Sequence, residues 1–403
     1  MTTMTTSASK RNGIPRGLAR TGPVLFSYGF RPFFLGGALW AIAAMGLWIG
    51  TVTGVMTFAE EYGPHHWHAH EMLFGYSSAV LAGFLLTAVP NWTGRLPVSG
   101  WPLFFLFLLW LSGRLVFLVS ERTGITAAVA VDALFLPALL LICVREVVAG
   151  RKWKDLKVIT GLAALSVANL VFHYEVVAGE HPDFAYRLAI AAYVGLIMVI
   201  GGRIIPSFTR NWINGRGRTD FPTPFNSFDS GCIAVGVLAL GLWVTAPDLQ
   251  VTALAALTGA VLHAVRLWRW RGWTTFAEML VAILHVAYLF VPLGFIAIAL
   301  ASIDIVDPTS ALHVMTIGTV ASMMIAVMTR ASRGHTGRAL TASKVTRMSY
   351  AAIVACALAR PATALVPEFT QTIYAVSGVL WLCAFGLFVI EYGPMLVLAR
   401  RKI

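Results

Sequence analysis

The feature that most constrains the fold is a series of twelve long apolar runs separated by short polar loops. About 20 apolar residues in a helix are enough to cross the hydrocarbon core of a bilayer. Only 12% of the residues are charged, whereas a soluble globular protein carries roughly a quarter. The sequence therefore predicts an all-α integral membrane protein with a twelve-helix transmembrane bundle over residues 32–399. The predicted spans cover residues 32–54, 68–90, 101–119, 125–147, 158–178, 185–206, 229–246, 249–268, 275–300, 309–329, 345–365 and 370–398.

Basic residues are distributed unevenly between the two sides that these spans define. If the N-terminus is cytoplasmic, 26 of the 30 Lys and Arg residues fall on the cytoplasmic side. Short cytoplasmic loops of membrane proteins are enriched in Lys and Arg, so both termini are predicted to be cytoplasmic. This topology explains the net charge of +12 without a nucleic acid partner. Residues 1–31 are predicted to form a cytoplasmic tail, and no cleavable signal peptide is expected because no apolar segment precedes Pro32.

The second and tenth predicted spans share a pattern of residues. Each has a His, a Gly five positions later and a Gly-Arg pair that ends 25 positions after the His; the two histidines are His70 and His313. Self-similarity of this kind indicates a repeated structural unit. The sixth span shares Pro206 with Pro90 of the second span, but it has Tyr186 where the His would fall. Three groups of four helices therefore stay an open alternative.

Histidines inside the predicted spans are functional candidates, because ionisable groups within a membrane are costly. His70 and His313 occupy matching places at similar depth, on helices that a symmetric bundle could make face each other. Two facing imidazoles can hold a six-coordinate haem, so these two residues are the predicted axial ligands. The alternative is that each ring hydrogen-bonds to a neighbouring helix. The further candidate metal ligands are His68, His173, His263, His285 and His335.

Other polar residues suggest further chemistry near the spans. Four histidines lie within residues 65–70, and imidazole suits copper; a solvated cap of histidines is the alternative. Arg114 and Asp132 lie in neighbouring antiparallel spans and are predicted to pair, either as a structural ion pair or as part of a proton route. Glu278 is either a snorkelling group or a proton entry point.

Several motifs extend over most of the chain from Arg31 to Arg338. They are Trp67–Gly75 (WHAHEMLFG), AGFLLTAVPNWTG at 82–94, LHAVR at 262–266 with WRGW at 270–273, LHVAY at 284–288 with PLG at 292–294, and AVMTR at 326–330 with GHTGR at 334–338. Together they resemble the NnrS family of bacterial membrane proteins. The resemblance implies a polytopic inner-membrane protein that contains haem and copper and is linked to nitric oxide response and denitrification. The motif histidines of this chain are His68, His70, His263, His285, His313 and His335.

The twelve-span plan is also similar in outline to that of the haem-copper oxidases, whose second and tenth spans hold a haem between two histidines. His70 and His313 would fit that role. The sixth span here lacks a His, so the copper site of those oxidases is not reproduced. His263 and His285, on adjacent spans, are the expected copper ligands instead, and a proton-pumping oxidase is not expected.

The resemblance implies a function in nitric oxide metabolism or protection against nitrosative stress. Nitric oxide, or its metal adducts, would be bound or reduced at a His-ligated haem. Reduction would make the protein an oxidoreductase similar to the nitric oxide reductases, and the sequence indicates no electron donor. The alternative from another class is a polytopic transporter or metal-delivery protein without nitric oxide turnover, since internal repeats and midplane polar groups also suit transporters. A sensor or assembly factor is a third alternative.

Overall fold

The computed structural model describes residues 22–399, and within them every regular element is a helix. Of the predicted tail, residues 1–31, residues 1–21 lie outside the described part of the chain. Seven spans are built on one main helix each: α1 (Phe30–Val52), α4 (Trp101–Leu118), α8 (Leu156–Val177), α11 (Ser227–Thr245), α12 (Gln250–Arg269), α13 (Met279–Ala301) and α17 (Thr370–Val397). The short helix η1 (Val24–Ser27) precedes α1, and other short helices lie between the spans: α5 (Ser120–Thr123), η3 (Trp153–Asp155), η5 (Gly272–Thr275), η7 (Arg360–Ala364) and η8 (Pro367–Phe369).

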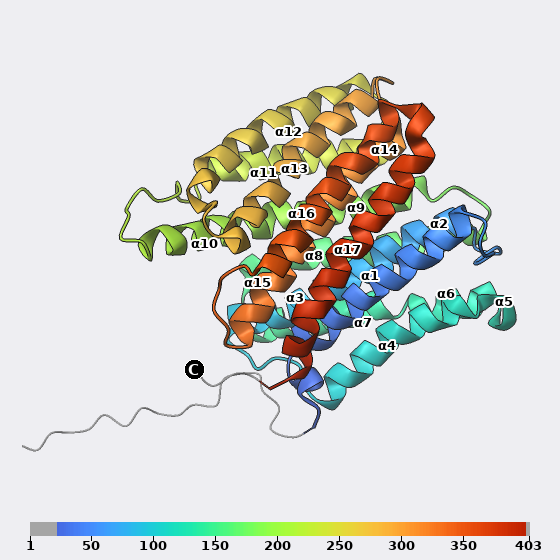
Figure 1. Ribbon diagram of the computed structural model, residues 1–403, viewed down its shortest axis with the longest axis horizontal. Helices are drawn as coiled ribbons and strands as arrows, with labels where there is room; N and C mark the ends of the chain where they lie inside the picture. Colours follow the sequence, from blue (N-terminus) through green and yellow to red (C-terminus); the bar gives the residue numbers. More distant parts are fainter. Residues whose placement is uncertain (1–21, 400–403) are drawn as a thin grey trace, which may run out of the picture.

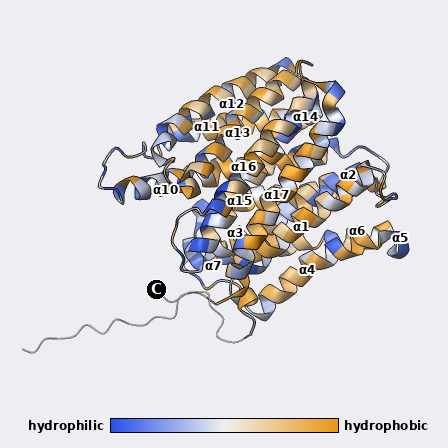
Figure 2. Ribbon diagram, in the orientation of Figure 1, coloured by the Kyte–Doolittle hydropathy of each residue, from blue (hydrophilic) through white to orange (hydrophobic). Residues whose placement is uncertain are grey.

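Four further spans are composite. They are α2–η2–α3 (Pro64–His70, Glu71–Tyr76, Ser77–Thr93), α6–α7 (Ile125–Asp132, Phe135–Ala149), α9–η4–α10 (Asp183–Leu196, Ile197–Gly201, Gly202–Asn214) and α14–η6–α15 (Pro308–His313, Val314–Ala321, Ser322–His335). Hydrophobic residues cover most of the helices, and hydrophilic ones gather at the loops and at the ends near α7 and α15 (Figure 2).

The predicted count of twelve spans is confirmed for eleven of them. Eleven helices in residues 22–399 are long and apolar enough to cross a membrane. The predicted span 345–365 corresponds to α16 (Lys344–Ala359) followed directly by η7. The 16 residues of α16 are about 24 Å long, so α16 is not among the eleven, and a crossing here stays a prediction. The α-helix ends here because Pro361 has no N–H for the next helical hydrogen bond, and η7 continues the chain as a 3₁₀ turn.

Three spans contain a π-helical segment in the described structure. These segments are η2, η4 and η6, and they fall in the second, sixth and tenth spans, the three that the repeat hypothesis relates. In two of them a serine bonds to the carbonyl five residues back: Ser77 Oγ donates to Met72 O at 2.7 Å, and Ser322 Oγ donates to Ile317 O at 3.1 Å. Short π segments are rare and frequently mark functional sites, so a site is expected beside one of these three.

The first and last helices, α1 and α17, pack side by side and close the bundle (Figure 1). Trp381 of α17 donates from Nε1 to Ala41 O of α1 at 3.0 Å. At the other end of this contact, the buried Arg31 donates to Leu396 O at 2.7 Å and to Leu398 O at 2.9 Å. The last carbonyls of a helix have no partner within the helix and carry partial negative charge, so Arg31 caps α17.

Replacing Arg31 with Ala is expected to lower the free energy of unfolding by about 2 kcal/mol, because hydrogen bonding to a charged group contributes roughly 1.5–3 kcal/mol and both carbonyls share one nitrogen, NH1. Denaturation of the purified protein in detergent, followed by circular dichroism, measures the change. Arg122→Ala is the matched control, because Arg122 is exposed and should change stability by less than ~0.5 kcal/mol. Equal effects of the two substitutions would contradict the capping role.

Candidate metal centre

Six buried polar residues from four spans meet at one point inside the bundle, and we call them the polar cluster. They are His70 and Glu71 at the α2–η2 junction, Arg114 of α4, Asp132 of α6, and Asn169 and His173 of α8. Each is at most 4% exposed. A buried charge is costly unless it is paired and hydrogen-bonded, so a group of this kind must either satisfy itself or bind something that does.

Local sequence brings these residues together. Gly63 has a φ of +83° and Pro64 occupies the first turn of α2, so the chain turns sharply into the helix that carries His70. Pro137 lacks the N–H that would bond to the carbonyl of residue 133, and the helix is broken between Asp132 and Phe135. Gly113 of α4 has no side chain to separate the helices: a Cβ there would lie 2.8 Å from Asp132 Oδ1.

Two imidazoles converge on one carboxylate oxygen. Asp132 Oδ2 lies 3.2 Å from His70 Nε2 and 2.9 Å from His173 Nε2. One ligand atom from each of the three residues lies within 4.8 Å of the others. Asn169 completes the group, with Nδ2 donating to Asp132 Oδ2 at 3.0 Å and Oδ1 lying 3.0 Å from His70 Nε2. Two nitrogens and one carboxylate oxygen form a ligand set that suits a transition metal.

The second nitrogen of each ring is held by another residue. His70 Nδ1 lies 3.0 Å from Glu71 Oε1, and His173 Nδ1 lies 2.9 Å from the hydroxyl of the buried Tyr62. Metal-ligating histidines almost always use their other ring nitrogen in this way, which fixes the tautomer and the ring orientation. Both Nδ1 atoms are therefore occupied by the protein, and both Nε2 atoms are directed to the same place.

The charges of the polar cluster leave one positive charge to be supplied. Arg114 pairs with both carboxylates: NH1 lies 3.1 Å from Glu71 Oε2, and NH2 bonds closely to Asp132 Oδ1. One guanidinium cannot neutralise two carboxylates. A neutral His70 has only one N–H, yet acceptors face both of its nitrogens. Either a proton on His70 or a metal ion between the two Nε2 atoms would satisfy this arrangement.

Gly75, one turn after Glu71, allows the ion pairs to form. A Cβ at this position would lie 2.3 Å from Glu71 Oε2 and 2.6 Å from Arg114 NH1. Gly75→Ala is therefore expected to separate the two charges and to lower the free energy of unfolding by about 1–3 kcal/mol, the usual cost of overpacking. Gly46→Ala in α1 is the control, because a Cβ there meets nothing within 4 Å; denaturation curves of both variants measure the difference. A Gly75→Ala protein as stable as the control would contradict the arrangement described.

The two predicted haem ligands have different neighbours. His70 belongs to the polar cluster and lies beside His173, with ring centroids 4.6 Å apart. His313 bonds through Nδ1 to Thr309 O at 2.6 Å and is close enough to His68 to interact electrostatically. Among the contacts of residues 22–399, none joins the His70 ring to that of His313, so their pairing around a haem stays a prediction.

His68 and His313 share their surroundings at one end of the second and tenth spans. The His68 ring stacks on Trp48 at 4.4 Å between centroids, and its Nδ1 is buried without a hydrogen-bond partner. Both histidines lie within electrostatic range of Arg360 in η7. Asp307 caps α14 by accepting from the backbone N–H of Ser310 at 2.8 Å, which fixes the turn that presents His313.

The remaining predicted ligands are apart from the polar cluster. His263 bonds through Nδ1 to Tyr288 and through Nε2 to Cys232 O, at 2.8 and 3.1 Å. His285 bonds through Nε2 to Thr209 at 2.8 Å. The two rings thus have different partners although α12 and α13 pack together, and their joint role as copper ligands stays a prediction.

His335 is exposed at the end of α15, and its ring lies 5.5 Å from that of Tyr28 and 5.4 Å from that of Phe30. Glu278 is not a snorkelling group: its carboxylate is buried and accepts from the backbone N–H of Leu280 and of Ala342, at 3.0 and 2.9 Å.

The sequence prediction that Arg114 pairs with Asp132 is confirmed. Asn169 and Tyr62 were not predicted. A signal for Asn169 does exist, because it precedes His173 by four residues and such residues share one helix face. No local signal identifies Tyr62, which reaches His173 from the loop before α2.

Comparison with known proteins gives one informative match. No curated protein matches the chain. A family model described as NnrS protein matches residues 24–400, which include all the residues of the polar cluster and every predicted ligand. Because this match covers nearly the whole chain, the protein belongs to the NnrS family.

Proposed function

We propose that this protein is a copper- and haem-containing protein of the bacterial cytoplasmic membrane that binds or reduces nitric oxide in protection against nitrosative stress. The observation that carries the proposal is the convergence of His70 Nε2 and His173 Nε2 on the buried carboxylate of Asp132. Membership of the NnrS family supports nitric oxide as the partner, and it favours this function over the transporter or metal-delivery alternative.

The polar cluster fits copper in ligand type and in charge. Imidazole nitrogen suits copper, and a cation between the Nε2 atoms would balance the second carboxylate, which Arg114 leaves uncompensated. Bound there, copper would supply a one-electron couple and a coordination position for nitric oxide. His70, His173 and Asp132 would hold the ion. Glu71 fixes the orientation of the His70 ring.

The surroundings of the polar cluster exclude water. Phe117 and Phe172 pack against the His70 ring, with centroids 5.2 and 5.6 Å away, and Phe117 also stacks on His173 at 5.8 Å. Trp40 donates from Nε1 to Glu71 Oε2 at 2.6 Å and closes the cluster on the side of α1. Nitric oxide is a small apolar molecule, so a dry site surrounded by aromatic rings favours it over water and anions.

The same packing does not fit a haem on His70, because the rings of Phe117, Phe172 and His173 lie 5.2, 5.6 and 4.6 Å from that imidazole and leave no room for a porphyrin beside it. His68 and His313 fit better. His313 Nδ1 is bonded to Thr309 O, which leaves Nε2 as the ligand atom, and His68 Nδ1 has no partner. Arg360 nearby offers a cation for a propionate. These contacts favour His68 and His313 as the haem ligands over the predicted pair of His70 and His313.

Optical spectra and nitric oxide consumption test the proposal together. The protein is purified from cells supplied with haem and copper, and nitric oxide is followed with an electrode in the presence of dithionite. We expect a Soret band, a shift of that band or of the copper signal on addition of nitric oxide, and a band that is lost in His68→Ala and His313→Ala but kept in His70→Ala. A protein with neither metal nor haem, or one whose spectrum does not change on addition of nitric oxide, would contradict the proposed function.

A further inference from the structure

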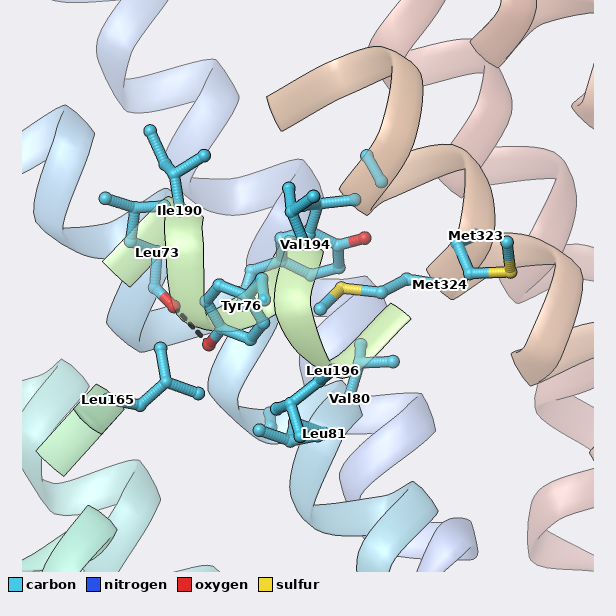
Figure 3. Packing of buried hydrophobic residues seen from close by; sticks show 14 of the residues in the cluster. Leu73, Tyr76, Val80, Leu81, Leu165, Ile190, Val194, Leu196, Met323 and Met324 are labelled. Carbon is cyan, nitrogen blue, oxygen red and sulfur yellow. Dashed lines mark hydrogen bonds between the residues drawn. The ribbon is translucent and has the colours of Figure 1, made fainter. Parts of the chain in front are cut away.

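An apolar cavity of about 70 Å³ lies where the three π-containing spans meet. Its walls come from α3, from α9, η4 and α10, and from α15. Val80, Leu81 and Leu196 lie together on one side, and Met323 and Met324 lie on the other (Figure 3). These five residues are buried, so the inner part of the cavity lies within the bundle, while the cavity is open on one side.

The lining offers a ligand no hydrogen bond. Tyr193 is the only lining residue with a hydroxyl group, and this hydroxyl donates to Leu73 O at 2.7 Å. Water needs two to four polar partners, and apolar cavities that lack them stay dry and bind apolar molecules instead. The volume is too small for a haem. The cavity therefore suits a small apolar molecule of the size of a dissolved gas.

The cavity is linked to the polar cluster through one hydrogen bond. Leu73, whose carbonyl accepts from the lining residue Tyr193, comes three residues after His70, which is about one helical turn from that ligand. The π segment η2 contains Leu73, and η4 contains Ile200, another lining residue. The wall of the cavity thus contacts the backbone that positions the proposed metal ligands.

The opposite end of the cavity reaches the outside of the bundle. Phe84, Ile204 and Val327 line this end and are half-buried, and each lies on a helix that is apolar enough to cross the membrane. Apolar gases concentrate in the hydrocarbon of a bilayer, because transfer of apolar groups out of water is favourable. The same effect favours the burial of apolar side chains. The half-buried end is therefore accessible to apolar molecules dissolved in the bilayer, and the opposite wall lies one hydrogen bond from the backbone of η2, which follows His70.

We propose that this cavity is a binding site for small apolar gas molecules, through which nitric oxide passes from the bilayer to the polar cluster. The identity of the gas depends on the proposed function, whereas the cavity's preference for a small apolar ligand does not. Xenon separates the two, because it is apolar and of similar size and binds no metal.

The experiment uses the full-length protein in lipid nanodiscs. Xenon binding is followed by ¹²⁹Xe NMR in the wild type, in Ile200→Trp, which fills the cavity, and in Val327→Trp, which blocks its half-buried end. Leu254→Trp on α12 is the matched control, because Leu254 is 66% exposed to the outside of the bundle. Nitric oxide association with the metal is then measured by stopped flow in the same four proteins.

We expect a bound xenon resonance in the wild type and in Leu254→Trp, and we expect it to be lost in Ile200→Trp. Association of nitric oxide with the metal should be about tenfold slower in Ile200→Trp and Val327→Trp than in the wild type, which is equivalent to ~1.4 kcal/mol of added barrier. Absence of bound xenon in the wild type, for example because an acyl chain occupies the space, would overturn the inference. Bound xenon in a protein whose metal does not respond to nitric oxide would support the gas site and reject the proposed function. Unchanged nitric oxide rates in both cavity variants would overturn the path.

Discussion

Replacing Asp132 with Ala is expected to lower the free energy of unfolding by about 3–5 kcal/mol, because three buried donors lose the carboxylate that accepts from them, at roughly 1–3 kcal/mol each. Arg114 is 1% exposed, and without Asp132 its NH2 would lose its carboxylate partner in a region that water does not reach. His173 Nε2 and Asn169 Nδ2 would lose their shared acceptor at the same time. Four helices would thus lose the contact that joins them.

Asp155→Ala provides the comparison. Asp155 also pairs with an arginine, Arg203, at 3.1 Å, but the Arg203 side chain is 45% exposed. Exposed pairs contribute about 0–1 kcal/mol, so this substitution should have little effect. Denaturation of the metal-free proteins isolates the ion pair from any ligand. Similar losses in the two variants would mean that Asp132 is not the centre of the polar cluster.

Replacing His70 or His173 with Ala is expected to weaken copper binding by more than about 100-fold, since loss of an outer hydrogen-bond partner alone costs roughly 10–100-fold in affinity. Each substitution removes one of three ligand atoms. Glu71→Gln and Tyr62→Phe should weaken copper binding by only about 10–100-fold, because each alters only the group that orients an imidazole. Equilibrium dialysis against buffered Cu(II) measures all four variants.

His335→Ala is the control for this series. His335 belongs to the same family motif set, but it is exposed at the end of α15, beside Tyr28 and Phe30. Its removal should leave copper affinity within about twofold of the wild type, less than a kcal/mol. If His335→Ala lost copper and His173→Ala retained it, the metal site would lie at the other end of the bundle.

Hydropathy predicts most of this fold because lipid imposes one requirement on every span. A segment of about 20 apolar residues must be helical, since only helices satisfy their own backbone in hydrocarbon. The eleventh predicted run, 345–365, was the exception. Its composition is apolar enough, but Pro361 ends the α-helix after 16 residues, an effect that an average over residues does not register.

The sequence did not predict which histidine rings lie close to one another, and His70 shows the reason. His70 and His313 each stand immediately before a π segment. Such a segment inserts a residue and rotates the later part of the helix by about 100° relative to a regular α-helix. The hydropathy pattern does not change at such an insertion, so the direction of each ring stayed undetermined. Asp132, by contrast, was paired correctly, because a carboxylate within a span needs a cation and Arg114 lies within the neighbouring antiparallel span.

X-ray absorption at the copper K edge tests the central claim most directly. If His70, His173 and Asp132 hold the metal, the purified protein loaded with one equivalent of copper should have two imidazole nitrogens and one carboxylate oxygen in its first coordination sphere. The His173→Ala protein should then show one imidazole nitrogen, if it retains any copper at all. A wild-type spectrum without imidazole scattering, or one that is unchanged when both His70 and His173 are replaced, would contradict the account.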